Sequence, residues 1–335
     1  MTRPPFRPAA LAAGAAVVVL GLSACGNSGG DQAAPPAPGA GDSGKIAVVA
    51  STNVWGSVAQ AVGGDKVDVQ SIIDSPDKDP HEYETTPQDA AKVGQAKVLI
   101  QNGGGYDSFM EKLVESSGNK APVIDAVQVS GLPGSAEASE HDHDHGAEKP
   151  AEGGEEEGPE FNEHVWYSFA TAHKVADDVA KQLSTADPAN AQTYASNAKA
   201  FDAKTDELTK KAAGIGQAHP KTKVAYTEPV PGYLLQAAKI QNVTPEEFSE
   251  AVEEGNDPPA AVVAKTLALF KAPAQAKALI LNSQTQSATT DQVRNAAQQG
   301  NVPVVEMSET LPAGVTDYGQ WMNQNLDALN GALGR

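Results

Sequence analysis

Segments with the composition of buried strands alternate with helix-like segments along two stretches of this chain. The strand candidates of the first stretch are KIAVVAST (45–52), KVDVQSII (66–73), KVLIQNGGG (97–105) and APVIDA (121–126); those of the second are TKVAYTE (222–228), KALILN (277–282) and VPVVEM (302–307). Strands that alternate with helices predict parallel sheets with helices on both faces. The expected fold class is therefore α/β, with two (β/α) lobes.

A long amphipathic run separates the two stretches. It follows Asp187 and Pro188, and its apolar face recurs at spacings of four and three residues, at Tyr194, Ala198, Phe201, Thr205, Leu208 and Ala212. A helix from 188 to about 215 would be about 40 Å long. We therefore expect an N-terminal lobe at 45–187, one long rigid linking helix at 188–216, and a C-terminal lobe at 217–335.

The first 24 residues have the pattern of a lipoprotein signal peptide. Arg3 and Arg7 precede an apolar run, Ala9 to Leu22, that is too short to span a membrane comfortably. The run ends in LSAC, which resembles a bacterial lipobox with Cys25 as the lipidated residue; an ordinary secretory peptide with a stray cysteine is the alternative. Residues 25–44 are rich in Gly, Pro, Ala and Ser and are expected to be a flexible tether. The folded part would then be extracytoplasmic, anchored through Cys25 to the outer face of the cytoplasmic membrane.

The chain is acidic, with a formal net charge of −19. This charge argues against nucleic acid or an anionic membrane surface as a partner, and it is compatible with the binding of cations. Solubility alone would explain the charge equally well. Cys25 is the only cysteine, so an internal disulfide is not possible.

Four places put a metal-binding side chain where a predicted strand gives way to a loop. They are His81 in DPHEYETTP (79–87), His164 in NEHVWYS (162–168), Glu228 in AYTEPVPGYLL (225–235), and Glu306 or Glu309 in VVEMSETLP (304–312). Each histidine alone is more easily explained as a surface or satisfied core residue, and a helix-capping role would explain Glu228 equally well. Together they predict a four-ligand site for a divalent first-row ion, because ligands bind at the carboxyl edge of open α/β sheets and because imidazole and carboxylate both suit such ions.

Two of these segments resemble the signatures of a known family. DPHEYETTPQDAAKVGQAKVLIQNGGGYDSFMEKL (79–113) is similar to the D-P-H-x-Y-E-x-T-P and N-G signature of the zinc- and manganese-binding solute-binding proteins of ABC transporters (cluster A-I). EHVWYS (163–168) resembles their second signature, commonly N-P-H-V-W. The resemblance, which is closer to the zinc-binding members, extends from about Lys45 to the C-terminus. It implies two (β/α) lobes bridged by a rigid backbone helix, with a metal site between the lobes.

The resemblance also implies which residues bind the metal. His81 and His164 match the pair of ligands in the N-terminal lobe. Glu228 falls where relatives carry His or Glu, and Glu309 falls where relatives mostly carry Asp. Asn282 lies where several relatives have Glu, and we expect it to line the site without binding.

The function implied by the resemblance is capture and delivery of a metal. The chain is expected to be a monomeric solute-binding protein that passes a divalent ion to the membrane permease of an ABC transporter, and not an enzyme. A metalloenzyme is disfavoured because four protein ligands leave no open position, and because no Ser-His or Cys-His arrangement is evident. A surface metal buffer or adhesin is the second alternative.

A histidine-rich segment bears on the identity of the metal. Residues 127–163 break the alternation and are expected to be a surface loop, His/Glu-rich over 135–163, in which His141, His143 and His145 would capture metal weakly. A solvated acidic loop is the alternative, and His173 and His219 are interpreted as bystanders. Such loops occur mainly in the zinc importers of the resembled family, so zinc is the expected cargo. Manganese is the alternative, since two histidines with two carboxylates lean toward it in that family.

Overall fold

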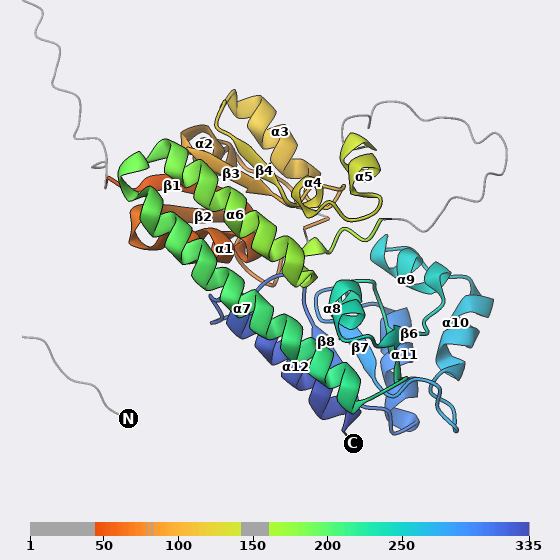
Figure 1. The fold of residues 1–335 in the computed structure, drawn as a ribbon. Coiled ribbons are helices and arrows are strands. Elements are labelled where there is room, and N and C mark those ends of the chain that lie inside the picture. Colours follow the sequence, from red (N-terminus) through yellow and green to blue (C-terminus); the bar gives the residue numbers. More distant parts are fainter. Residues whose placement is uncertain (1–43, 79, 82, 142–160, 335) are drawn as a thin grey trace, which may run out of the picture. The chain divides into compact units, whose positions relative to one another are not determined.

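Two parallel four-stranded sheets organise the chain in the computed structural model, which describes residues 44–78, 80–81, 83–141 and 161–334 (Figure 1). The first sheet has the order β2-β1-β3-β4 and contains β1 (Ile46–Thr52), β2 (Val67–Ile73), β3 (Val98–Gln101) and β4 (Val123–Asp125). The second has the order β6-β5-β7-β8 and contains β5 (Lys223–Tyr226), β6 (Gln241–Asn242), β7 (Leu279–Asn282) and β8 (Val304–Met307). The two sheets therefore repeat one topology, and the predicted α/β class with two lobes is confirmed.

Helices cover both sheets (Figure 1). Those of the first half are α1 (Asn53–Gly63), α2 (Pro87–Gln95), α3 (Ser108–Ser117), α4 (Ala126–Ser130), α5 (Ser135–His141) and α6 (Phe169–Ala186), with the 3-10 turns η1 (Gly64–Lys66) and η2 (Val165–Tyr167). After the 3-10 turn η3 (Pro188–Asn190) come α7 (Ala191–Ala218), α8 (Gly232–Ala237), α9 (Glu246–Glu253), α10 (Ala260–Ala268), α11 (Ala288–Gln299) and α12 (Tyr318–Leu333). Among the described residues, none of these helices combines the length and the apolar character that a membrane crossing needs.

The long helix α7 connects the two halves. It has 28 residues, and it runs beside α6 of the first half and α12 of the second (Figure 1). Its buried residues are Tyr194, Ala198, Phe201, Thr205, Leu208, Ala212 and Ile215, which include every apolar-face position predicted from the spacing. A rigid helix that packs on both halves limits how far they can move apart.

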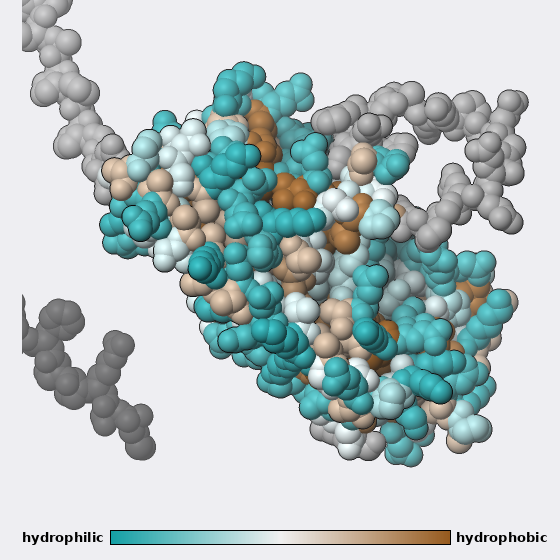
Figure 2. Space-filling view, in the orientation of Figure 1, coloured by the Kyte–Doolittle hydropathy of each residue, from teal (hydrophilic) through white to brown (hydrophobic). Residues whose placement is uncertain are grey.

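One hydrophobic core extends through both halves. Trp55 on α1, Trp166 in η2, Leu208 on α7 and Trp321 on α12 are all buried in the same cluster. On the face shown in Figure 2 the residues are mostly hydrophilic, and the hydrophobic ones form small separate patches. That the protein is a monomer stays a prediction.

Residues 127–163 contain more regular structure than the sequence led us to expect. The helices α4 and α5 occupy part of this segment, so the prediction of a loop is wrong for residues 127–130 and 135–141. The side chain of Asp125 caps α4 by accepting the N–H of Gln128, and Gly131 ends this helix in the left-handed conformation, at a φ of 58°. Helices of five and seven residues are too short to show a periodicity.

The start of α2 carries a capping box. The side chain of Thr86 accepts the N–H of Asp89, and the Asp89 carboxylate accepts the N–H of Thr86. Pro87 occupies the first turn, where its missing N–H costs nothing. The capping box fixes the end of the connection that carries His81.

Two glycines of α7 test how closely this helix approaches the second half. A Cβ at Gly216 would overlap the backbone carbonyl of Ala238, whereas a Cβ at Gly214 would meet nothing within 4 Å. We expect Gly216→Ala to lower the free energy of unfolding by about 1–3 kcal/mol through overpacking. Gly214→Ala should raise it by about 0.5–1 kcal/mol, because alanine favours the helix. Urea unfolding followed by circular dichroism measures both, and equal effects would contradict the close approach.

Candidate metal centre

Three neighbouring strands of the second sheet bring polar side chains to one edge. Glu228 follows β5 by two residues, Asn282 ends β7, and Glu309 follows β8 by two residues. Because β5, β7 and β8 are parallel neighbours, their carboxyl ends lie side by side. Two carboxylates and one amide therefore meet at this edge.

Two histidines of the first half reach the same place on irregular segments. His81 lies on the connection from β2 to α2, and His164 comes immediately before η2. His164 does not follow a strand, so the expectation that all four candidates lie at strand ends is wrong for this residue. The buried side chains of Val165 and Trp166 anchor its segment instead.

The structure brings three of the four predicted ligands together. One potential ligand atom each of His81, His164 and Glu309 lie within 4.8 Å of one another. Ligand atoms around a tetrahedral zinc ion are about 3.4 Å apart, so side-chain movements of about 1 Å would close such a group around an ion. His164 and Glu309 are buried, with exposed fractions of 0% and 2%, whereas 30% of the His81 side chain is exposed.

The surroundings of His164 leave one ring nitrogen available to a metal. Nδ1 lies 2.8 Å from Oδ1 of Asn162, and this oxygen also accepts the backbone N–H of His164. Nδ1 therefore carries the proton and donates it, which puts a lone pair on Nε2. Nε2 is buried and has no hydrogen-bond partner among the described residues. Burial, and then the proximity of His81, hold the pKa of His164 well below its usual value, so the ring stays neutral.

Asn282 joins the two glutamates. Its Nδ2 donates to Oε2 of Glu228 over 2.6 Å and to Oε1 of Glu309 over 2.7 Å. Glu228 is thus one amide group away from the three clustered candidate ligands, and it is as deeply buried as His164 and Glu309, with 3% exposed. The hydrogen bonds donated by the Asn282 amide offset part of the repulsion between the two buried negative charges.

Aromatic side chains close one side of the site. Tyr106 packs edge-on against His81, with 5.1 Å between ring centroids, and lies 4.6 Å from Trp166. The Tyr106 hydroxyl donates to Oε2 of Glu309 over 3.1 Å. Burial, and then the charge of Glu309, raise the pKa of Tyr106, so it remains a proton donor. These rings keep water from the carboxylates on this side.

The two candidates on the last strand point to different places. Glu306 is on β8 with 63% of its side chain exposed, and it lies 3.7 Å from Arg294. Glu309 is buried beside the histidines. Of the two acids, only Glu309 is placed where it could bind the same ion as His164.

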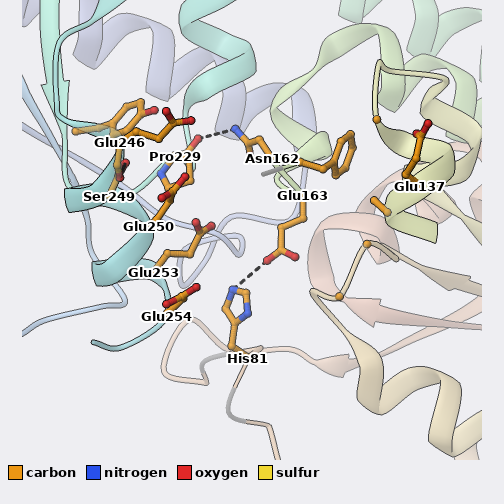
Figure 3. A pocket seen from close by; sticks show the side chains of 16 residues that line it. His81, Glu137, Asn162, Glu163, Pro229, Glu246, Ser249, Glu250, Glu253 and Glu254 are labelled. Carbon is orange, nitrogen blue, oxygen red and sulfur yellow. Dashed lines mark hydrogen bonds and ion pairs between the residues drawn. The ribbon is translucent and has the colours of Figure 1, made fainter. Parts of the chain in front are cut away.

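An acidic cleft leads to His81 (Figure 3). Its volume is about 720 Å³, and its acidic lining residues are Glu137, Glu163, Glu246, Glu250, Glu253 and Glu254. Lys and Arg are absent from its described lining. Oε1 of Glu163 lies 3.3 Å from Nε2 of His81, and Oε1 of Glu253 lies 3.5 Å from Nδ1 of His164. Such a cleft attracts cations and repels anions.

Several residues of the site were missed from the sequence. Tyr106, Asn162, Glu163 and Glu253 contact the predicted ligands, but none of them was a candidate ligand in the sequence. Asn162 and Glu163 could have been suspected, because they directly precede His164. Tyr106 and Glu253 approach only through the fold, so their sequence positions carry no signal.

Not all of the candidate residues fall in the part of the chain that the structure describes. Cys25, His143 and His145 fall outside the described residues, as does the side chain of His141 at the end of α5. His219 is a surface residue whose Nε2 lies 3.2 Å from Oδ1 of Asn330.

Comparison with known proteins gives concordant matches. Residues 48–332 match the model of the ZnuA family, described as zinc-uptake complex component A, periplasmic. The iron ABC transporter substrate-binding lipoprotein MtsA of Streptococcus pyogenes is 29% identical over 264 residues, which cover 72% of this chain and 76% of that protein. The manganese ABC transporter substrate-binding lipoprotein PsaA of Streptococcus anginosus is 32% identical over 177 residues, half of each chain.

Solved structures share the fold. The periplasmic zinc-binding protein TroA of Treponema pallidum superposes with a TM-score of 0.69 at 18% identity, covering 87% of this chain and 100% of that one. A crystal structure of ZnuA gives a TM-score of 0.65 at 21% identity, covering 85% and 96%. At these identities the likeness concerns the fold alone.

The buried, neutral His164 predicts how stability depends on pH once a chelator has removed metal. Its folded-state pKa lies well below the ordinary 6.5, so the unfolded chain binds more protons at this residue. Stability should therefore fall as the pH drops below about 6.5. In His164→Gln, which cannot titrate, the loss between pH 7.5 and 5.5 should be smaller. Urea unfolding of both proteins at the two pH values checks this, and parallel losses would contradict a buried neutral ring.

Proposed function

The chain belongs to the ZnuA family of zinc-uptake complex components, and we propose that it captures zinc outside the cytoplasmic membrane and delivers it to the permease of an ABC transporter. Its relatives are substrate-binding lipoproteins of ABC transporters. The protein is therefore a metal-binding component of such a transporter and not an enzyme. Binding and release, with no chemical step, are its activity.

The observation that carries the proposal is the buried Nε2 of His164. A lone pair held in a dry site, with the other nitrogen fixed by Asn162, is arranged to bind a metal. We propose His81, His164, Glu228 and Glu309 as the four ligands. Glu228 can bind the ion as the fourth ligand once the Asn282 amide no longer donates hydrogen bonds to the two carboxylates.

The cleft supports capture from dilute solution. Its carboxylates come from the first half, at Glu163, and from the second half, at Glu250 and Glu253. They raise the concentration of cations next to His81, the most exposed of the proposed ligands. We propose that the ion enters from this side and loses its water as it passes to the buried carboxylates.

Small movements suffice for release. Asn53 and Leu311 exchange two hydrogen bonds between the halves, of 2.9 Å and 3.3 Å, and Tyr167 donates to the carbonyl of Ser308 over 2.8 Å. These bonds and the shared core resist a wide hinge opening. We propose that the permease displaces the segment around His81, which is the least buried part of the site.

Zinc is the proposed cargo, with manganese as the alternative. Zinc binds most nitrogen and oxygen sites more tightly than manganese does, so tight zinc binding in solution does not identify the ion that is transported. The histidine-rich segment favours zinc, because imidazole suits zinc better than manganese. Two carboxylates beside two histidines are the argument for manganese.

The anchor and the partner complete the proposal. We propose that Cys25 is lipidated and holds the protein at the outer face of the cytoplasmic membrane, where it acts as a monomer and meets the permease. A surface metal buffer or adhesin would need no permease. The names of the relatives favour transport over that alternative.

The four-ligand site is tested by paired glutamate substitutions. Glu309→Gln should weaken zinc binding at least about 100-fold, because it removes one of four bonds to the ion. Glu306→Gln, on the same segment but exposed, should leave affinity unchanged. Calorimetric titration of protein made without the lipid anchor measures both, and His164→Gln should abolish the tight site. Equal affinities in the two glutamate variants would mean that Glu309 is not a ligand.

The histidine-rich segment is tested by replacing His141, His143 and His145 together with asparagine. The tight zinc site should remain, since its proposed ligands lie outside this segment. Weaker zinc equivalents contributed by these imidazoles should disappear at pH 7.5, and in the unchanged protein they should be lost at pH 5.5, where free histidines are protonated. Competition titrations with a zinc chelator measure this. An unchanged zinc stoichiometry would favour a solvated acidic loop and weaken the case for zinc.

A further inference from the structure

A second group of metal-binding side chains lies between α6 and α7, apart from the centre described above. His173 and Asp177 are one helical turn apart on α6, and Asp202 faces them from α7. Nε2 of His173 is 3.4 Å from Oδ2 of Asp177, and Nδ1 is 3.4 Å from Oδ1 of Asp202. One potential ligand atom of each residue lies within 4.8 Å of the other two. We propose that His173, Asp177 and Asp202 bind a second divalent cation, for which zinc is the best fit.

The charges around this group favour a cation. In the described ranges, Asp177 and Asp202 each form an ion pair with His173 and with no Lys or Arg. Two carboxylates therefore flank a single imidazole, so the group carries more acidic than basic side chains.

A buried oxygen atom points to the same conclusion independently of charge. Oδ1 of Asp202 is inaccessible to solvent and accepts no hydrogen bond from the described residues. It lies 3.4 Å from Nδ1 of His173. A carboxylate oxygen removed from water without a hydrogen bond is costly, and a bound cation would remove that cost.

The set of donors suits zinc with partial hydration. One imidazole nitrogen and two carboxylate oxygens would bind directly, and water would complete the coordination. Side-chain exposure is 39% for His173, 59% for Asp177 and 23% for Asp202, so the ion would remain in contact with solvent. We therefore expect an affinity well below that of the buried centre. Because its ligands come from two helices, the bound ion would also tie α6 to α7 and stabilise the folded state.

The experiment counts zinc ions in the full mature chain carrying His164→Gln, which disables the main centre. Asp202→Asn in this background should remove one weakly bound zinc ion in titrations against a chelator. The same substitution should abolish the part of the zinc-dependent rise in melting temperature that comes from this site. Asp177→Asn, at an exposed position where misfolding is not expected, should have the same two effects.

Asp178→Asn is the matched control, because it changes the same charge on the neighbouring residue of α6, which faces Lys181. It should leave the number of zinc ions and the zinc-dependent melting shift as in the background. Weak binding by the histidine-rich segment is common to all these proteins and cancels in the comparison. If Asp202→Asn and Asp177→Asn bind as many zinc ions as Asp178→Asn, the proposed site does not exist. That result would leave the proposed transport function untouched, because tight binding is measured in the chain with His164 intact.

Discussion

Two carboxylates buried side by side impose the constraint on which the rest of the metal centre depends. Glu228 and Glu309 are almost completely removed from water, and a neutral amide, Asn282, donates to both. An amide compensates two negative charges only in part, because charges buried in a medium of low polarity need an opposite charge nearby. His164 cannot supply that charge, since burial keeps its ring neutral. A divalent cation can, and two imidazoles give it further ligands, so the chemistry of the site suits a divalent cation.

The hydrogen bonds and core packing around the carboxylates, which we call the frame, give the site a fixed shape. Tyr318 donates to the carbonyl of Trp166 over 2.6 Å, and Tyr167 donates to the carbonyl of Ser308 over 2.8 Å, so each half holds backbone of the other. These bonds lie inside the shared core, next to α7 and α12. Three of the four proposed ligands are therefore placed by packing, whereas His81 is placed by a connection partly open to solvent. A movement of His81 would therefore change the coordination of a bound ion and disturb the packing less than a movement of any other proposed ligand.

The sequence predicted the frame well because the frame is made of periodic patterns. The seven predicted strands and the buried face of α7 each depend on residue types at regular local spacings, whereas the two-residue strand β6 was not predicted. The helices α4 and α5 were missed because they are too short to show a period. In the site, Tyr106 and Glu253 were missed because they approach the ligands only after folding. The structure was also needed to choose between Glu306 and Glu309, because the choice depends on which of the two side chains is buried.

The two groups of metal-binding residues contain similar donors, and their burial sets them apart. In the main centre, Asn162 fixes the tautomer of His164, and the two carboxylates are held by hydrogen bonds before an ion arrives. Little conformational freedom remains to be lost on binding, and water competes poorly for a buried ion. Between α6 and α7 the carboxylates are partly hydrated, and His173 can turn either nitrogen toward an ion. The types and spacing of the residues therefore identify where an ion can bind. Burial of the ligands, and their orientation before the ion arrives, decide which of the two groups can hold a scarce metal long enough to deliver it.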